Sequence, residues 1–219
     1  MGLVEADMKI LNLYAGIGGN RKLWGDDHEI TAVEYDPVIA AIYQDYFPND
    51  KVVVGDAHQY LLDHFGEFDF IWSSPPCPTH SRINTGNTLS PYKDNSAQIT
   101  NGGGFAPRYP DMALYQEIIL LQSFYKGGYC VENVIPYYKP LIPAQERDRH
   151  LFWANFYIPE IEKGKSKMDV KPNEELASMG YDLSQYKGID KRKVMRNCVY
   201  PEVGSHILGS YLKQTPMLL

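Results

Sequence analysis

The chain has 219 residues, a net charge of −6 and 44% hydrophobic residues, which suffices for one well-buried domain and is short for two. No apolar run approaches the roughly 20 residues that a membrane helix requires, and residues 1–7 lack the charged start and apolar core of a signal peptide. Three cysteines lie far apart without a CxxC pair, which argues against a disulfide framework and a zinc module. We expect a single domain over residues 1–219, in the cytoplasm and without a membrane partner.

Charge is unevenly distributed along the chain. Residues 1–76 hold 4 Lys/Arg against 13 Asp/Glu, and the remainder holds 17 against 14. The overall acidity argues against binding nucleic acid by bulk attraction. Two local basic clusters, at residues 163–167 and 191–196, could nevertheless meet phosphates, although a solvated surface explains either cluster equally well.

Short apolar runs alternate with helical patterns, which predicts an α/β protein with a mostly parallel sheet. The runs expected to form strands are residues 10–14, 30–33, 52–54, 68–72, 129–131 and 151–156. Between them, Asp36 followed by Pro37 predicts a helix start, a second helix begins near Asp111 with an apolar stripe through Tyr125, and a weak helical stretch spans 174–179. A last helix after Pro201 should return to cover the first strand.

Residues 78–109 are rich in asparagine and contain three consecutive glycines at positions 102–104. Such a stretch is too polar to pack as a regular element. Loops of this length are usually functional or disordered.

A glycine-rich turn at residues 14–19 follows the first predicted strand, where the backbone can approach a nucleotide-like group closely. It is not the dinucleotide fingerprint, because the third glycine position is occupied by Arg21. Glu34 and Asp56 end the next two strands and could accept hydrogen bonds from a ribose and from an adenine amine. The three strand ends describe an adenosine pocket without a phosphate clamp, which S-adenosylmethionine satisfies; each acid could instead be a helix cap.

Cys77 lies between Pro76 and Pro78, directly after the strand at 68–72. Proline fixes φ and restricts the residue before it, so the chain should leave the sheet in one direction and present the thiol. On its own, this pattern fits a proline-rich turn with a buried cysteine better. A metal site formed by Cys77 and His80 lacks a second ligand pair, and His80 is expected to face solvent or DNA.

Two further segments carry polar groups near strand ends. Glu132 ends the strand at 129–131, beside the strand that leads to Cys77. Gln145, Arg147 and Arg149 alternate just before the last strand, and period-two spacing predicts that they share one face.

Five motifs follow one another in the chain: the turn at 14–19; Pro76-Cys77 with Ser81; Glu132-Asn133-Val134; Gln145-x-Arg147-x-Arg149; and Asn197-Cys198-Val199-Tyr200-Pro201. In this order they resemble the cytosine-C5 DNA methyltransferases over nearly the whole chain apart from residues 157–190. The resemblance implies the class I S-adenosylmethionine-dependent methyltransferase fold: seven mostly parallel strands, helices on both faces and a C-terminal helix that returns to the N-terminal strand.

The resemblance also implies roles for individual residues. Cys77 would attack carbon 6 of cytosine as a thiolate, Glu132 would hold the ring, and Arg149 and Arg147 would support it. Neighbouring cations such as Arg149 or Arg82 could lower the pKa of the thiol. The residues implied around S-adenosylmethionine are Tyr14, Ala15, Gly16, Gly18, Gly19, Glu34, Tyr35, Asp56, Ala57, Pro76, Asn197 and Cys198.

A target base must leave the duplex to be methylated, so the resemblance implies that residues 78–109 are a mobile catalytic loop. Residues 157–195 form a reduced target-recognition segment, which predicts a short recognition sequence. The residues expected to contact DNA are Ser81, Arg82, Arg108, Lys163, Lys165 and Arg192.

The small size fits a compact viral or prophage-type enzyme, monomeric, acting on double-stranded DNA in a bacterial or phage-infected cytoplasm. A cognate restriction endonuclease is a candidate partner. Two alternatives remain: the same chemistry on tRNA or other RNA, and a non-catalytic adenosine-binding or DNA-binding module.

Overall fold

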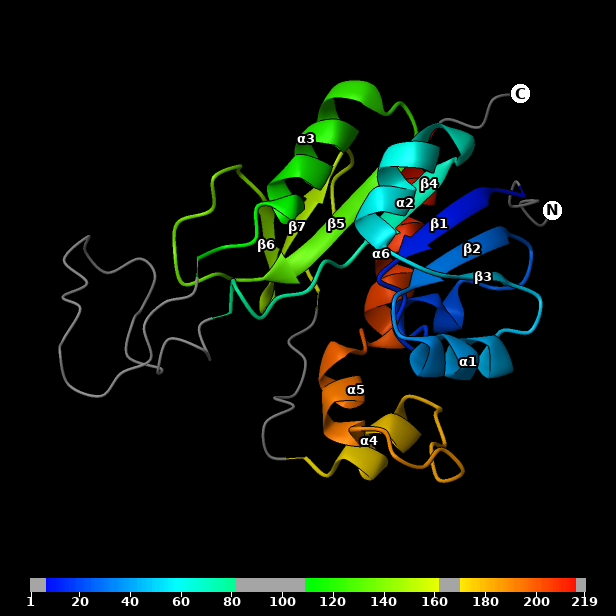
Figure 1. Cartoon of the computed structure of the whole chain (residues 1–219). Helices are drawn as coiled ribbons and strands as arrows, with labels where there is room; N and C mark the ends of the chain where they lie inside the picture. Colours follow the sequence, from blue (N-terminus) through cyan, green and yellow to red (C-terminus); the bar gives the residue numbers. More distant parts are fainter. Residues whose placement is uncertain (1–6, 82–108, 162–169, 216–219) are drawn as a thin grey trace, which may run out of the picture.

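The structure, a computed structural model, describes residues 7–81, 109–161 and 170–215. A seven-stranded sheet in the order β3-β2-β1-β4-β5-β7-β6 runs through its centre (Figure 1). The strands are β1 (Lys9–Leu13), β2 (Glu29–Glu34), β3 (Lys51–Val54), β4 (Phe70–Ser73), β5 (Gly128–Val134), β6 (Gln145–Arg147) and β7 (His150–Ala154). Strands β1 to β5 pair in parallel, whereas β7 is antiparallel to both β5 and β6. The expected seven-stranded, mostly parallel sheet is confirmed.

The described residues also form six α-helices and two short 3-10 helices. They are α1 (Pro37–Tyr46), α2 (Ala57–His64), α3 (Ala113–Phe124), α4 (Pro172–Ser178), α5 (Lys191–Asn197), α6 (Pro201–Gln214), η1 (Asn20–Leu23) and η2 (Phe65–Glu67). The predicted helix start at Asp36 is confirmed, since its carboxylate accepts hydrogen bonds from the backbone of Val38 and Ile39. The sequence pattern does not predict α5. Within the described parts of the chain, no helix has the length and apolar character to cross a membrane.

The two faces of the sheet are covered by different helices, as strand alternation requires. Leu11 and Ile71 belong to a buried cluster with α2 and α3, whereas their neighbours Ile10 and Trp72 belong to a second cluster with Trp24, directly after η1, and α6. Figure 1 shows α2 and α3 on one side of the sheet and α6 on the other. The expected return of the last helix to the first strand is therefore confirmed.

The segment between β7 and α6 packs on the glycine-rich turn and on α1. Leu176 and Tyr181 are buried together with Ile17 and Ile42 in a third cluster that includes α4 and α5. The described part of this segment thus covers the end of the sheet where the glycine-rich turn lies.

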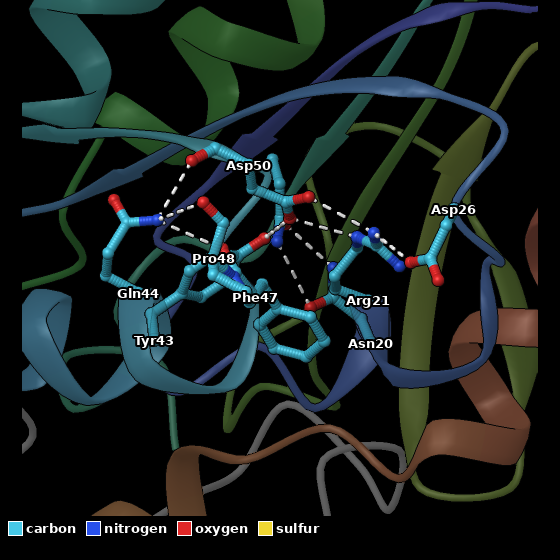
Figure 2. A network of polar contacts seen from close by, with 9 residues as sticks. Asn20, Arg21, Asp26, Tyr43, Gln44, Phe47, Pro48 and Asp50 are labelled. Carbon is cyan, nitrogen blue, oxygen red and sulfur yellow. Dashed lines mark hydrogen bonds and ion pairs between the residues drawn. The ribbon is translucent and has the colours of Figure 1, made fainter.

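Arg21, at the position of the missing third glycine, forms a buried ion pair with Asp50. Its Nε and Nη2 atoms donate to the two carboxylate oxygens at 3.0 and 3.1 Å, and the Tyr43 hydroxyl donates to the same carboxylate at 2.7 Å (Figure 2). Hydrogen bonding to Asp50 raises the pKa of Arg21, although its burial opposes this. Arg21 therefore holds the glycine-rich turn to the start of β3.

Breaking this pair should destabilise the fold. Asp50→Asn leaves the buried guanidinium without its counter-charge, so we expect the free energy of unfolding in urea to fall by about 3 kcal/mol. Asp26→Asn is a matched control, because Asp26 also contacts Arg21, at 3.4 Å, but its side chain is 89% exposed; its loss should cost less than about 1 kcal/mol. Equal losses in the two variants would contradict this assignment.

Candidate functional site

The candidate site lies at the edge of the sheet where the parallel strands β1 to β5 end. Tyr14 follows β1, Glu34 ends β2, Asp56 follows β3, Cys77 follows β4 and Glu132 lies in the last half of β5. Because parallel strands end at the same edge, the topology brings these five predicted residues to one side of the molecule.

The glycine-rich turn is fixed by Glu34. Gly16 has φ of +56° with open space where a side chain would begin, and its backbone N–H donates to Glu34 Oε2 at 2.9 Å. Glu34 Oε1 accepts from the backbone of Asp36 at 2.9 Å. A carboxylate offers about four acceptor positions, so Glu34 retains capacity for hydroxyl donors at the open side of Gly16.

The turn also packs against the last motif of the chain. A Cβ on Gly19 would overlap the carbonyl oxygen of Val199 and lie 2.5 Å from the Cys198 sulfur. Gly18 packs in the same way against the rings of Tyr43 and Phe47. Asn197 precedes buried Cys198 and is exposed, so the fifth motif meets the first at this edge.

Apolar side chains are unusually exposed beside these acids. Tyr35 is 78% exposed and Val54, which pairs with Glu34 across the sheet, is 55% exposed. Asp56 Oδ1 caps α2 by accepting from the backbone of Gln59 at 3.1 Å, as the alternative reading of that acid expects, and the residue itself is exposed. Ala15 and Ala57 are buried beneath. Apolar surface flanked by acceptors fits a purine ring and its ribose.

Cys77 is half-buried in a turn that is held to the end of β5. Its carbonyl oxygen accepts from the backbone of His80 and Ser81, each at 2.9 Å. The buried Asn133 amide donates to the carbonyl of Pro75 at 3.0 Å, and Ser81 forms a bridge with Pro136. These contacts fix the thiol-bearing turn, including the exposed Pro76, against the strand that carries Glu132.

The electrostatic surroundings of the thiol differ from the expectation. Burial and then the negative charge of Glu132 raise the pKa of Cys77. The expected lowering by neighbouring cations is therefore wrong for the described residues: Arg149 Nε lies 3.4 Å from the Asp148 carboxylate, and Arg82 lies outside them. The pairing of β4 with β5 and the hydrogen bond from Asn133 to Pro75 bring Cys77 and Glu132 to the same site.

Glu132 has a neighbour that the sequence does not reveal. Its side chain is 12% exposed, and Oε1 lies 3.5 Å from Nε2 of His150. In the antiparallel register Glu132 pairs with Phe152 and Val134 with His150. The sequence does not predict that Glu132 and His150 lie close together, because this depends on the pairing of β5 with β7. From the sequence alone, His150 is a single histidine before a strand.

The expectation that Gln145, Arg147 and Arg149 share one face is wrong. Strand β6 ends at Arg147, and Asp148, with φ of 49°, turns the chain into β7. The alternation of side chains along β6 therefore does not extend to Arg149. Arg147 Nε donates to the carbonyl of Ile158 at 2.7 Å, and Gln145 Nε2 donates to that of Phe156 at 2.8 Å. Arg147 therefore anchors the segment after β7, and its expected catalytic role stays a prediction.

Glu117 is a buried acid at this edge that sequence reasoning misses. Its side chain, on α3, is fully buried and accepts from the hydroxyls of Tyr14 at 2.6 Å and Ser73 at 2.7 Å; His58 Nδ1 lies 3.1 Å away. The available signal is an acid between Leu114 and Ile118 on the apolar stripe of the helix.

His80 is 1% exposed, with Nδ1 2.6 Å from the Tyr138 hydroxyl. The expectation that it faces solvent or DNA is wrong, because the turn after Cys77 directs its ring into the protein.

Of the predicted DNA contacts, Ser81 lies in the bridge beside the Cys77 turn and Arg192 is exposed on α5. Lys193 and Arg196 are also exposed on that helix. The remaining predicted contacts, Arg82, Arg108, Lys163 and Lys165, lie outside the described residues, as do 82–108 of the predicted loop and 162–169 of the predicted recognition segment.

Residues 8–91 match the family model described as C-5 cytosine-specific DNA methylase. The matched range runs from β1 through the Cys77 turn. The chain is also 27% identical, over 95 residues, to a tRNA (cytosine(38)-C(5))-methyltransferase of Rattus norvegicus. This alignment covers 41% of the chain and 24% of the relative, so the chain spans about a quarter of the length of the curated relative it matches.

Similar solved structures include a DNMT2 mutant from Spodoptera frugiperda, 26% identical with a TM-score of 0.35, covering 57% of this chain and 35% of that one. A putative methyltransferase, yhhF, from Escherichia coli is 15% identical with a TM-score of 0.43, covering 69% and 76%. An S-adenosylmethionine-dependent methyltransferase from Agrobacterium tumefaciens is 13% identical with a TM-score of 0.40, covering 60% and 40%.

The family match covers the strand ends that form the adenosine-type pocket and the cysteine turn. The strand-end surface with the open Gly16 turn, the Glu34 carboxylate and exposed Tyr35 and Val54 offers groups that suit S-adenosylmethionine, the cofactor that the family match indicates. Over residues 8–91 the chain is therefore similar to the C-5 cytosine-specific DNA methylases, and the second comparison likewise aligns it with a cytosine-C5 methyltransferase.

Proposed function

We propose that the chain transfers a methyl group from S-adenosylmethionine to carbon 5 of a cytosine in double-stranded DNA, with Cys77 as the nucleophile. The observation that carries this proposal is the pairing of Cys77 with Glu132. The two lie at the ends of adjacent strands, the Asn133 amide ties their motifs together, and the charge of Glu132 acts on the thiol.

The chemistry requires a nucleophile that also leaves easily. The Cys77 thiolate forms a bond to carbon 6 of the ring, and the electrons of the carbon 5–carbon 6 double bond move to carbon 5. S-adenosylmethionine would supply an electrophilic methyl group to that carbon, with its sulfur leaving as the thioether of S-adenosylhomocysteine. Water then removes the proton from carbon 5. The electrons of that carbon–hydrogen bond re-form the double bond between carbon 5 and carbon 6, which breaks the carbon–sulfur bond and releases Cys77.

Glu132 is placed to hold the cytosine ring during this sequence. A carboxyl group can engage ring N3 and the exocyclic amine, and so stabilise the charge that develops when carbon 6 is attacked. His150, 3.5 Å from Glu132, orients the carboxyl group. We assign to Arg149 the contact with the ring carbonyl oxygen.

The donor side is assigned to the other strand ends. Glu34 accepts from the ribose hydroxyls, Asp56 accepts from the adenine amine, and Tyr35 and Val54 cover the ring. Tyr14, Ala15, Gly16, Gly18, Gly19, Ala57, Pro76, Asn197 and Cys198 complete the proposed cradle.

We assign the nucleic-acid contacts to helix α5 and to the two segments 78–109 and 157–195. Arg192, Lys193 and Arg196 give α5 an exposed basic side that can meet phosphates. Residues 78–109 are proposed to enclose the extruded base, and residues 157–195 to read a short recognition sequence.

The second candidate is the same reaction on RNA. It is favoured by the relative from Rattus norvegicus, which is a tRNA methyltransferase. Attack by the thiolate and support of the ring by an acid are the same in either polymer, because the sugar takes no part in them.

Transfer of labelled methyl groups to duplex DNA and to tRNA, measured side by side, separates the two candidates. We expect label in DNA that depends on Cys77, located at cytosine by nuclease digestion and mass spectrometry. Label confined to tRNA would establish the second candidate. Donor binding without transfer to either polymer would contradict both and leave a non-catalytic binding module.

A further inference from the structure

Glu117 is unusual because a fully buried carboxylate joins three separate elements. Tyr14 comes from the end of β1, His58 from the first turn of α2 and Ser73 from the end of β4. Buried carboxylates persist only where charge and hydrogen-bond donors compensate their desolvation. Two hydroxyl donors and an imidazole nitrogen converge on this one acid at the site edge, which indicates a defined arrangement.

Tyr14 has a backbone that needs such support. Its φ of 55° lies in the left-handed region, which is unfavourable for a bulky residue with a Cβ. Conformations of this kind persist where the surroundings over-determine them. The Tyr14 hydroxyl donates to Glu117 at 2.6 Å, so this contact holds the first residue of the glycine-rich turn.

His58 links Glu117 to the segment that follows the end of β3. It follows Asp56 by two residues, and its Nδ1 lies 3.1 Å from Glu117. The charged groups that face it are Glu117 of α3, Asp56 at the start of its own helix and Asp111 before α3, and together with the hydrogen bond to Glu117 they raise the pKa of His58. The acidic surroundings favour the protonated form of His58 as the partner of Glu117.

We propose that Glu117 is a positioning residue for the methyl donor: it anchors Tyr14 and His58, and thereby holds the glycine-rich turn and Asp56 in the geometry that binds S-adenosylmethionine. This inference rests on the proposed function, because it assigns a role within the same donor site. Glu117 acts through the residues it anchors and does not itself touch the donor.

The test compares donor affinity by isothermal titration calorimetry with S-adenosylmethionine. Tyr14→Phe removes one hydroxyl from Glu117 and should weaken donor binding about tenfold, the effect of losing a hydrogen bond to a charged group. Glu117→Gln should weaken it by at least as much. Transfer measured at saturating donor should change much less, so the loss appears in the KM for the donor rather than in kcat.

Tyr125→Phe is the matched control. The Tyr125 hydroxyl donates to the carbonyl of Phe68 at 2.9 Å, just before β4 begins and therefore at the opposite edge of the sheet. This variant should lose stability in urea as Tyr14→Phe does, yet bind the donor like the parent. If Glu117→Gln does not fold, Tyr14→Phe decides the question.

Donor affinities of Tyr14→Phe and Glu117→Gln within twofold of the parent would overturn the inference and leave Glu117 a purely structural residue. In that result the parent still binds and transfers, so the proposed function stands. A parent chain that fails to bind S-adenosylmethionine would instead overturn the proposed function and this inference together.

Discussion

Cys77→Ala is expected to lower methyl transfer by at least about a thousandfold, since removal of a catalytic nucleophile typically costs this much or more. Alanine cannot form the bond to carbon 6, and without it carbon 5 is too weakly nucleophilic to accept a methyl group. The measurement is label transfer under saturating donor. Donor affinity should stay within about twofold of the parent, because the proposed contacts to the donor do not require the sulfur.

Cys130→Ala is the control for this substitution. Cys130 lies on β5, is fully buried and faces the cluster with α6, so its replacement should reduce stability and leave transfer at saturating donor close to that of the parent. Retention of more than about one hundredth of the activity by Cys77→Ala would remove Cys77 from the role of nucleophile.

Glu132→Gln is expected to change thiol reactivity and catalysis in opposite directions. The carboxylate raises the pKa of Cys77, so its neutralisation lowers that pKa and increases the thiolate fraction at a given pH. Alkylation of Cys77 by iodoacetamide at pH 8 should then be several-fold faster. Methyl transfer should fall about a hundredfold or more, because the charge that develops on the ring loses its stabilising group.

The alkylation rate of the parent should still be rising at pH 9, because burial and then the charge of Glu132 raise the pKa of Cys77 and only the thiolate reacts. Glu146→Gln, an exposed position on the neighbouring strand β6, should leave both the rate and its pH dependence unchanged. Slower alkylation of Glu132→Gln would show that the acid activates the thiol, contrary to the structure.

The positions of strands β1 to β5 and β7 along the chain were predictable because the signals are local. Apolar runs bounded by polar turns mark buried parallel strands, and Asp36 with Pro37 combines two helix-start signals. The hairpin between β6 and β7 was not predictable. It depends on Asp148 adopting a left-handed conformation, which aspartate tolerates but does not require. Helix α5 was also missed, because Val194 and Met195 stabilise it through burial against α4 rather than through a long apolar stripe.

The part of the candidate site that depends only on strand topology was predictable. Residues that end parallel strands must meet at one edge, so Glu34, Cys77 and Glu132 could be grouped from sequence. Contacts between distant segments could not be predicted from the sequence. Glu117 is separated in sequence from Tyr14 by 103 positions and from His58 by 59, yet it contacts both. The direction of the pKa shift of Cys77 was missed for the same reason, because it depends on burial and on which charge lies nearest.

The most direct measurement is covalent trapping on a polymer that contains 5-fluorocytosine, incubated with the protein and S-adenosylmethionine. Fluorine at carbon 5 replaces the proton whose loss releases the enzyme, so the carbon–sulfur bond should persist. We predict a denaturation-resistant complex in which mass spectrometry locates the base on Cys77, and none with Cys77→Ala. A parent chain that methylates unmodified cytosine but forms no adduct, or forms it at another residue, would contradict the assignment of Cys77.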